Sequence, residues 1–510
     1  MLLGGVFASW GAVLADEARP TPLVVRRMLC ARPAPGCRID ASPAVEEVLA
    51  GARAELAALG DTLPDVADII SLCSSQAQIG LVEATSEQTG RIDAGAAVLA
   101  LVLACLDSAT RADPAILESY AVMLADLAAR IPSAVITGTN GKSTTTRMVR
   151  AALQTRGSVA SNTNGDNMTS GVITAFMNAR TASAAALEVD EMHVPSVADA
   201  VRPRVFVYLN LSRDQLDRVG EIGAVERRLR EGAAAHPGAV VIANCDDPLI
   251  VSAACDNDNV VWVAAGGGWG GDSAAYPRGG RVVREEGSWH LIPSRPGEEL
   301  PALASRPEPD WWLTDVDLRP EGPRATLNGP NGTAVPLALA LPGRANLGNA
   351  AQAVAAAVAM GVDAEAAARA VSGVDEVAGR YSTHDVDGRL ARLMLAKNPA
   401  GWQEAMTMID PRVDQVVIAV NGQVPDGQDL SWLWDVDFAA LDAQGRRVVA
   451  CGERGADLAV RLEYAGIHCQ LAPLPMDALA LCRPGKVEML LNYTAMRDFK
   501  TVLGEKGARR

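Results

Sequence analysis

The sequence predicts an α/β protein with more than one domain, and three observations lead to that prediction. Short β-branched runs alternate with helical patterns, which is typical of strands and helices that build a parallel sheet. This alternation occurs twice, first from residue 133 to about 370 and again from about 380. The chain, at 510 residues, is also too long for one ordinary domain. We therefore expect a helical N-terminal extension over 1–90, a central parallel-sheet domain over 91–375 and a smaller C-terminal α/β domain over 376–510.

The composition is that of a globular protein with several hydrophobic cores, since 49% of its residues are hydrophobic and 21% are charged. A formal net charge of −15 argues against general binding of nucleic acid. Nine cysteines are scattered without a C-x-x-C pair, as expected for reduced, mostly buried thiols of a cytoplasmic protein. No apolar stretch reaches the ~20 residues of a membrane span, so we do not expect an integral membrane protein.

Helical patterns dominate the sequence before the first expected strand. The Ala/Leu-rich "SPAVEEVLAGARAELAALG" (42–60) begins at a Ser-Pro pair, which is a helix-start signal. A second pattern, "DPAILESYAVMLADLAARIP" (113–132), has proline in its first turn and leads into the first strand. The strands expected in the central domain then follow as "SAVIT", "AAALEV", "RVFVYLNL", "AVVIAN" and "VVWVAA".

Residues 264–335 interrupt this alternation with glycine, proline and tryptophan, and we interpret them as an irregular insertion with β-hairpins. A helix returns with "ANLGNAAQAVAAAVAMG" (345–361). The C-terminal domain has strands of its own, expected at "LARLMLA", "QVVIAVN", "RRVVACG" and "VEMLLNY". The two series of strands predict two separate sheets.

A phosphate-binding loop is expected where the strand "AVIT" meets the helix "STTTRMVRAAL". Glycines let backbone N–H groups approach an anion closely, and the helix N-terminus adds its dipole. Lys142 can reach the β- and γ-phosphates of ATP, and the Ser143 hydroxyl can bind Mg²⁺. The standard loop would carry glycine at position 136, where this chain has Ile136. The sequence thus predicts a variant ATP-binding loop made of Gly138, Thr139, Asn140, Gly141, Lys142, Ser143 and Thr144.

This loop and the motifs after it resemble one family. The pattern T-G-T-N-G-K-[ST]-T is similar to the ATP loop of Mur ligases, which activate a carboxylate as an acyl phosphate. Later motifs are "LEVDE" (187–191), "NCDDP" (244–248), "LPGRANLGNAAQA" (341–353), "LAKNPAGWQE" (395–404) and "DGQDLSWLWDVDF" (426–438). Together they resemble the MurT family, the Mur ligase-like subunits of lipid II isoglutaminyl synthases, over about residues 90–505. The resemblance implies a Mur ligase-type fold for the central domain.

The resemblance also implies ATP and Mg²⁺ as cofactors and assigns residues to them. Ser143 and Glu188 match the family's Mg²⁺ ligands, and oxygen donors suit that ion. Asn349 matches the asparagine that packs against adenine, although the aromatic residue usual before it is Gly348 here. Asn346 could be only a helix cap. Asp190 and Glu191, next to Glu188, have an ordinary use as acids at a helix start.

The motif "RDQLDR" (213–218) has Gln215 where many Mur ligases carry histidine, and the MurT family shares this glutamine. No lysine lies between Lys142 and Lys397, so the carbamylated lysine of many Mur ligases has no candidate in this stretch. Asp214 and Asp217 either act near the metal or form a salt-bridged helix start, and the sequence leaves both uses open.

In the MurT family, an aspartate of the C-terminal motif completes a catalytic triad with the cysteine and histidine of GatD, a glutamine amidotransferase. The matching residue here is Asp429, so the resemblance implies a GatD-like partner subunit. Asp426, Asp435 and Asp437 are alternatives, each with an ordinary use in a turn or helix cap. Cys451 follows an expected strand, and we expect it to be buried and not nucleophilic.

MurT proteins usually carry a four-cysteine zinc ribbon in the middle domain, whereas this chain has no cysteine from 256 to 450. A zinc ribbon needs thiolates paired at close spacing. We therefore expect no structural zinc.

The sequence as a whole predicts an ATP-dependent carbon–nitrogen ligase with Lys142, Glu188 and Asp429 as catalytic residues. It would amidate a carboxylate through an acyl phosphate, using ammonia from a glutaminase partner. By resemblance the carboxylate belongs to D-glutamate in the stem of lipid II, a peptidoglycan precursor, although the missing ribbon leaves other carboxylates open. Two alternatives also stay open, a stand-alone amino acid or peptide ligase and a non-catalytic nucleotide-binding scaffold.

Overall fold

The computed structural model describes residues 124–508 except 163–165, 180, 213–221, 267–273, 320–321, 376–380, 424–425, 427–428 and 442–444. The predicted N-terminal extension and the helix expected over 42–60 lie outside the described residues, as do Asp214, Gln215 and Asp217. Of the helix expected over 113–132, the described part is helical from residue 124 to 128. Among the described helices, none is long and apolar enough to cross a lipid bilayer.

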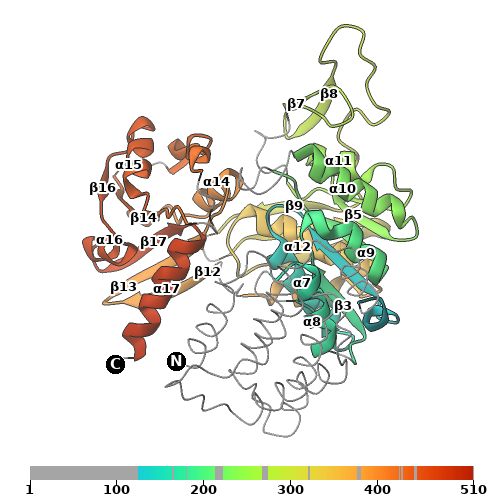
Figure 1. The fold of residues 1–510 in the computed structure, drawn as a ribbon, viewed down its shortest axis with the longest axis horizontal. Coiled ribbons are helices and arrows are strands. Elements are labelled where there is room, and N and C mark those ends of the chain that lie inside the picture. Colours follow the sequence, from blue (N-terminus) through green and yellow to red (C-terminus); the bar gives the residue numbers. More distant parts are fainter. Residues whose placement is uncertain are drawn as a thin grey trace, which may run out of the picture. The chain divides into compact units, whose positions relative to one another are not determined.

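The central domain contains a parallel six-stranded sheet with the order β2-β3-β1-β4-β5-β6 (Figure 1). Five of these strands lie within the runs expected from the sequence, whereas β2 has only two residues and leaves no pattern to detect. The strands are β1 Ser133–Thr137, β2 Val159–Ala160, β3 Ala184–Glu188, β4 Val205–Tyr208, β5 Val240–Asn244 and β6 Val260–Val263. The helices are α7 Lys142–Gln154, α8 Thr169–Asn178, α9 Val194–Val201, α10 Ile222–Ala235, α11 Pro248–Ala254, α12 Arg344–Ala359 and α13 Ala364–Ser372.

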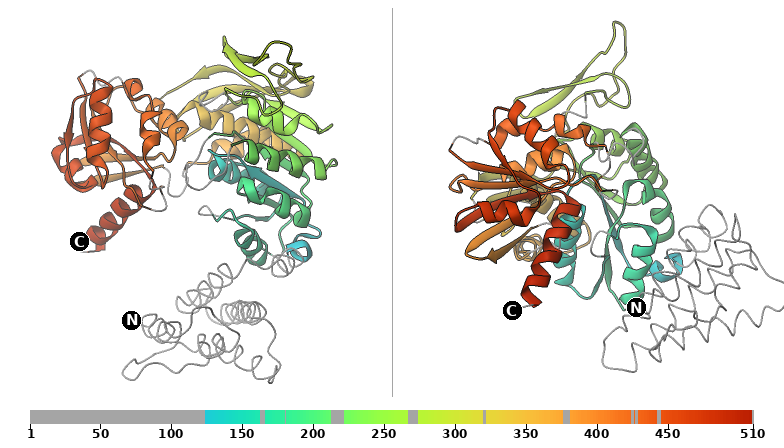
Figure 2. Two further views of the ribbon diagram at one scale, coloured as in Figure 1. Left: turned by 45° about the horizontal axis from the view of Figure 1, so that its top comes forward. Right: turned by 60° about the vertical axis from the view of Figure 1, so that its left-hand side comes forward.

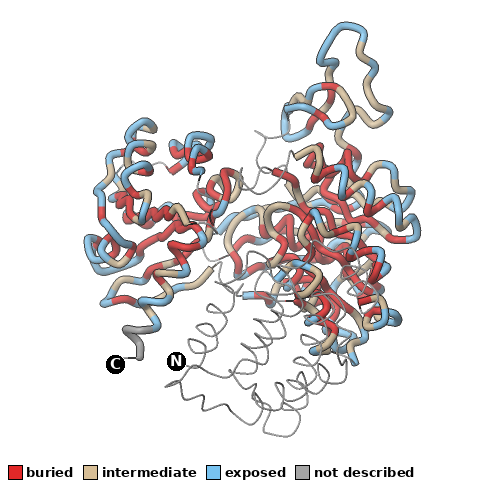
Figure 3. The backbone as a smooth tube through the Cα atoms, viewed as in Figure 1, coloured by how far each residue is buried: buried red, intermediate tan, exposed pale blue. Residues whose placement is uncertain are grey.

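Helices cover both faces of this sheet, which is why its strands are hydrophobic throughout. In β4, Val205 and Val207 belong to the core that the sheet shares with α7, α12 and α13. The next side chain, Tyr208, points to the other face, where its hydroxyl donates to Leu229 O of α10 at 2.8 Å. The strands at the centre of this sheet are buried along their whole length, as the tube in Figure 3 shows.

Antiparallel strands fill the region between β6 and α12. They form the hairpin β7 Arg281–Glu285 with β8 Ser288–Ile292, which projects from the sheet in Figure 2, and a three-stranded sheet. The three strands are β9 Trp312–Asp317, β10 Arg324–Gly329 and β11 Thr333–Ala338. The hairpin side has a small core of its own, with Tyr276, Trp289 and Leu291 against Val251 of α11. Trp289 Nε1 also donates to Cys245 O at 2.9 Å.

The C-terminal domain contains a second six-stranded sheet with the order β12-β13-β17-β14-β15-β16, parallel except for the edge strand β12. Its strands are β12 Tyr381–Val386, β13 Arg389–Leu395, β14 Gln415–Ala419, β15 Arg447–Cys451, β16 Cys469–Leu471 and β17 Gly485–Leu491. Its helices are α14 Pro399–Thr407, α15 Gly455–Tyr464, α16 Pro475–Leu481 and α17 Tyr493–Ala508. The predicted fold class, a central parallel sheet with a smaller C-terminal α/β domain, is confirmed. The domain boundaries remain predictions.

Candidate functional site

The predicted phosphate loop joins β1 to α7, and its two glycines take backbone angles that only glycine adopts readily. Gly138 has a φ of +133° and Gly141 a φ of +88°. Neither position has room for a side chain, because a Cβ at Gly138 would lie 2.9 Å from Asn210 O and one at Gly141 2.7 Å from Asn349 Oδ1. α7 begins directly after this turn, at Lys142. The N–H groups of its first turn therefore face the loop.

The loop lies at the point where the connections of neighbouring strands diverge, since β1 leads toward β2 on one side and β4 toward β5 on the other. Ligands of open α/β sheets bind at such points. The segment after β4 fixes the loop: Asn140 N donates to Asn210 Oδ1, and Asn210 Nδ2 donates back to Asn140 O, both at 2.9 Å. Thr139 Oγ1 also donates to Ser212 O at 3.1 Å. The anion-binding conformation is therefore held by the fold itself.

Lys142 is buried at the start of α7. Its Nζ donates to Gly138 O at 2.8 Å and forms an ion pair with Glu191 Oε1 at 2.9 Å. Glu191, for which the sequence indicates an ordinary use as a helix-start acid, begins the short 3-10 helix Glu191–His193. Its contact with Lys142 had no signal in the sequence. Burial, followed by the negative charge of Glu191, raises the pKa of the adjacent Asp190.

Glu188 and Ser143, the predicted Mg²⁺ ligands, lie on β3 and α7, which pack against each other. Glu188 ends β3 opposite Ile136 of β1 and is 4% exposed, while Ser143 follows Lys142 in the first turn of α7. Asn162 fixes the backbone at Glu188, donating to Glu188 O at 2.7 Å and accepting from Glu188 N at 2.8 Å. Within the described ranges no three His, Cys, Asp or Glu side chains gather as a metal site. The pair still fits an ion that takes few protein ligands and keeps its waters, as Mg²⁺ does.

One further polar group supports a ligand at the loop. Thr137 Oγ1, at the end of β1, is buried and has no hydrogen-bond partner among the described residues. Buried hydroxyls usually have a partner. The unpaired hydroxyl, the glycine turn and the buried lysine together fit the binding of a phosphate group.

Asn349 contacts the loop from α12. It lies against Gly141, and its Nδ2 donates to Asn346 Oδ1 at 3.3 Å. Asn346 in turn donates to Pro342 O at 2.6 Å, so it supports both Asn349 and the start of the helix. Gly348 has a steric explanation, because a Cβ there would lie only 2.0 Å from Ala265 O. The backbone after β6 therefore occupies the space that a side chain at 348 would need.

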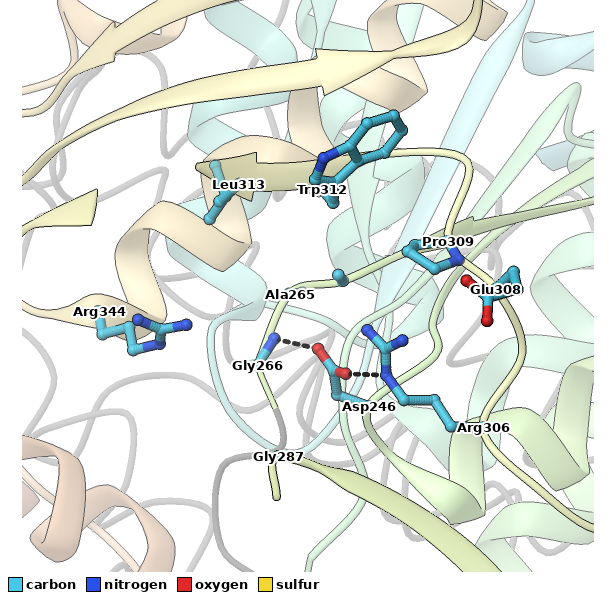
Figure 4. Close-up of a pocket in the computed structure, with 11 residues that line it drawn as sticks. Asp246, Ala265, Gly266, Gly287, Arg306, Glu308, Pro309, Trp312, Leu313 and Arg344 are labelled. Atoms are coloured by element: carbon cyan, nitrogen blue, oxygen red, sulfur yellow. Dashed lines mark hydrogen bonds and ion pairs between the residues drawn. The ribbon is translucent and has the colours of Figure 1, made fainter. Parts of the chain in front are cut away.

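A pocket of about 540 Å³ opens beside this end of α12 (Figure 4). Arg344, the first residue of α12, lines it together with Trp312 of β9 and Arg306. Asp246 also lines the pocket and connects two of its walls, because it accepts from Arg306 Nε at 2.6 Å and from Gly266 N at 2.7 Å. Ala265 lines the same pocket, and its carbonyl lies against Gly348, the residue before Asn349. The sequence did not predict this pocket, because its walls come from several separate segments.

The second aspartate of "NCDDP" connects β5 to the phosphate loop. Asp247 caps α11 by accepting from Leu249 N at 2.9 Å and Ile250 N at 3.3 Å, and its other oxygen accepts from Leu211 N at 2.8 Å. Leu211 precedes Ser212, whose backbone contacts Thr139 of the loop. Burial raises the pKa of Asp247 to about 6, against the effect of these three hydrogen bonds.

The C-terminal domain adds contacts next to the loop through α14. Glu404 accepts from Ala345 N of α12 at 3.1 Å, and burial raises the pKa of this carboxyl. A Cβ at Gly401 would lie 3.8 Å from Asn140 Oδ1. The motif "LAKNPAGWQE" therefore lies near the predicted ATP loop.

Asp429 lies elsewhere in that domain and is exposed. Hydrogen bonds from the Ser431 N–H, at 2.8 Å, and from the Ser431 hydroxyl lower the pKa of Asp429. Of the alternatives, Asp426 is buried against Thr494 at the start of α17, and Asp437 accepts from Ala439 N at 3.1 Å. Cys451 is buried, and burial raises its pKa to about 12, so its thiol is not ionised near neutral pH.

Comparison with known proteins agrees with this geometry. The chain matches the Mur ligase middle domain over residues 136–268 and the MurT ligase C-terminal domain over 395–496. The MurT subunit of the lipid II isoglutaminyl synthase (glutamine-hydrolyzing) of Streptococcus pneumoniae is 28% identical over 408 residues, which cover 75% of this chain and 90% of that protein.

Two solved structures share the fold. MurF from Acinetobacter baumannii has a TM-score of 0.59 and 18% identity, covering 76% of this chain and 79% of that one. The folylpolyglutamate synthase of Mycobacterium tuberculosis, solved with ADP, has a TM-score of 0.56 and 17% identity, covering 79% of this chain and 98% of that one.

The fold, the phosphate loop and the middle-domain match define a Mur ligase-like protein, which by class is an ATP-dependent ligase. Within this class the chain is similar to the MurT subunits over both its middle and its C-terminal domain.

Proposed function

We propose that this protein is the ATP-consuming subunit of a glutamine-dependent amidotransferase that converts a carboxylate into an amide. The observation that carries the proposal is the joint presence of a complete phosphate loop and a MurT-type C-terminal domain with an exposed aspartate. In the reaction, a carboxylate oxygen takes the γ-phosphoryl group of ATP and ADP leaves. Ammonia then attacks the acyl carbon, phosphate leaves with the carbon–oxygen bond, and the amide forms after loss of a proton.

The residues of the loop divide the work of phosphoryl transfer. The N–H groups of the first turn of α7 bind phosphate oxygens, and Lys142 neutralises charge that moves to the β,γ-bridging oxygen. Ser143 and Glu188 would hold Mg²⁺, which supplies charge neutralisation at the phosphates when bound. Asn210 and Ser212 keep the loop in its binding conformation, so little rearrangement is needed at the moment of reaction.

The nucleoside would lie along the first turns of α12, beside Asn349 and toward the pocket of Trp312 and Arg344. An amide that contacts Gly141 is close enough to the loop to bind the base of the same nucleotide. The indole and guanidinium groups that line the pocket suit a planar ring or a ribose.

The proposed substrate is the α-carboxyl of D-glutamate in the stem peptide of lipid II, because the relative from Streptococcus pneumoniae is named as a lipid II isoglutaminyl synthase subunit. The name of that relative also states that its enzyme hydrolyses glutamine. A GatD-like glutaminase is therefore the proposed source of ammonia, with Asp429 completing its triad. The described cysteines after β14 are poor candidates for the glutaminase nucleophile, which supports a partner as its source. Cys451 and Cys482 are buried, and burial raises the pKa of Cys469.

The proposal is tested by ADP release from the full-length protein with lipid II, ATP, Mg²⁺ and ammonium chloride. We expect ADP and isoglutaminyl lipid II in equal amounts, with glutamine replacing ammonium only when the glutaminase partner is added. ADP release that requires an amino acid and ignores ammonium would favour the stand-alone ligase. Nucleotide binding without ADP release in any of these mixtures would favour the non-catalytic nucleotide-binding scaffold.

A further inference from the structure

The lysine of the phosphate loop already forms an ion pair with a carboxylate of the chain itself. Glu191 Oε1 lies 2.9 Å from Lys142 Nζ, and the exposed fractions of the two side chains are 11% and 10%. Burial strengthens the attraction, since charges in a low-dielectric site are poorly screened. The lysine expected to bind the nucleotide phosphates is therefore paired before any nucleotide arrives.

The backbone after β3 places Glu191 at this position. Val189 N donates to Ile136 O at 2.9 Å, which extends the pairing of β1 and β3 beyond Glu188. Asp190 then caps the 3-10 helix by accepting from Met192 N at 3.0 Å. The 3-10 helix also packs against α10. The carboxylate is thus fixed by the sheet and an adjoining helix, and it does not belong to a loose surface segment.

Building on the proposed ATP-dependent function, we propose that Glu191 is the resident counter-ion of Lys142 and that the phosphates of the nucleotide must displace it. Two anions that contact one ammonium repel each other, so the phosphates and Glu191 compete for the same proton donors. The pair keeps a buried lysine neutralised in the absence of ligand, which avoids an uncompensated charge.

This competition lowers the apparent affinity for nucleotide. If binding requires Lys142 to leave Glu191, the apparent Kd rises by the inverse of the unpaired fraction. A lysine paired for about nine-tenths of the time would weaken binding about tenfold. Mg²⁺ reduces the charge of the nucleotide and therefore reduces its repulsion with Glu191.

The test is equilibrium titration of the full-length protein with a non-hydrolysable ATP analogue, once in EDTA and once in excess Mg²⁺. Glu191→Gln removes the charge but keeps an oxygen that can accept from Lys142. Glu191→Asp keeps the charge on a shorter side chain and should act in the same direction with a smaller effect. Glu365→Gln is the matched control, because Glu365 is an exposed acid on α13 that pairs only on the surface with Arg369.

We expect Glu191→Gln to lower the Kd about three- to tenfold in EDTA and less in Mg²⁺, with no change for Glu365→Gln. An unchanged or higher Kd in EDTA, in a variant that melts like the wild type, would overturn the inference. Weaker binding only in Mg²⁺ would also overturn it and would make Glu191 a metal ligand instead. A wild-type protein that binds no nucleotide in either condition would refute the proposed function itself, and the two failures are thus distinguishable.

Discussion

The two six-stranded sheets use the carboxyl ends of their strands in opposite ways. In the central sheet, the turn after β1 is a glycine turn that leads into α7, and Asn210 holds it through two hydrogen bonds to Asn140. In the C-terminal sheet, the ends of β14 and β17 are closed by their own side chains. Asn421 N donates to Asn492 Oδ1 at 3.0 Å, and Asp426 accepts from Thr494 N at 3.2 Å.

This difference suits a complete nucleotide site in the central domain and a C-terminal domain that contributes one residue to a site completed elsewhere. In the central domain, the buried carboxylate of Glu191 pairs with Lys142, and Glu188 is buried at the end of β3. Asp429 is exposed, and its described hydrogen bonds come from Ser431 just beyond it. An aspartate in a triad needs a histidine that it can orient. In the proposed function, phosphoryl transfer therefore belongs to the central domain, and Asp429 belongs to a site that a partner completes.

The largest effect is expected for Lys142→Ala, which removes the cation from the phosphate loop and leaves Glu191 unpaired beside it. We expect ADP release to fall below detection with either nitrogen donor, because both routes use the same phosphoryl transfer. Lys486→Ala is the control, since that lysine is exposed and lies 3.9 Å from Asp410. Full activity of Lys142→Ala with partner and acceptor present would remove the loop from the mechanism.

The next effect separates the two regions most directly. Asp429→Asn keeps the size of the side chain but loses the charge, so it can hold the partner's histidine in the wrong tautomer. In a serine protease that change costs about four orders of magnitude, and we expect a smaller but still large loss for a cysteine enzyme. Activity driven by ammonium should persist, because the phosphate loop is untouched.

The measurement is one variant assayed with glutamine and with ammonium, beside Asp457→Asn as an exposed control that pairs with Arg454. Equal losses with both donors would assign Asp429 to folding or to the ligase reaction. A loss in Asp435→Asn or Asp437→Asn, with Asp429→Asn active, would move the triad role to that neighbour.

Local patterns in the sequence predict the central strands and the phosphate loop well, because strand, glycine turn and helix start are contiguous there. Contacts across the fold left no such pattern. Lys142 and Glu191 are 49 residues apart, and Asp247 and Leu211 are 36 apart, so both pairs depend on strand order. In the sequence, Gly348 stands where the family usually has an aromatic residue. In the structure, the carbonyl of Ala265 leaves no room for a side chain at this position.

Asp247→Asn should have a moderate effect that tests how the central site is held. The amide nitrogen cannot accept, so either Leu211 N or the cap of α11 loses its partner, at a cost of about 1–3 kcal/mol in unfolding free energy. The segment at Ser212 should loosen beneath Thr139, which weakens nucleotide binding severalfold. Stability of the C-terminal sheet should be unaffected, and hydrogen exchange measured for each sheet separately would show this.

The same variant makes a prediction for pH. Burial raises the pKa of Asp247 to about 6, whereas the unfolded side chain ionises near 3.8. Between these values the folded state keeps a proton that the unfolded state has lost, so this group's stabilisation falls as pH rises toward 6 and is constant above. Asparagine does not titrate. The destabilisation by Asp247→Asn should therefore be larger at pH 4.5 than at pH 7.5, by roughly 2 kcal/mol. A difference of zero would show that Asp247 is ionised throughout.

The smallest effect is expected from a metal chelator, which should not change the melting temperature, because we expect no zinc in the region between β6 and α12. The sequence lacks thiolate pairs there, and the hairpin of β7 and β8 instead packs Trp289 and Leu291 against Tyr276. The Trp289 indole also anchors the hairpin to the main chain at Cys245. Hydrophobic burial and one hydrogen bond thus stabilise this hairpin, and Trp289→Ala should cost about 3–5 kcal/mol as a large core truncation. Treatment of nucleotide-free wild type with a strong chelator should leave its melting temperature unchanged, and elemental analysis should find well under one zinc per chain. A stoichiometric zinc whose removal lowers the melting temperature would contradict the prediction that this protein has no structural zinc.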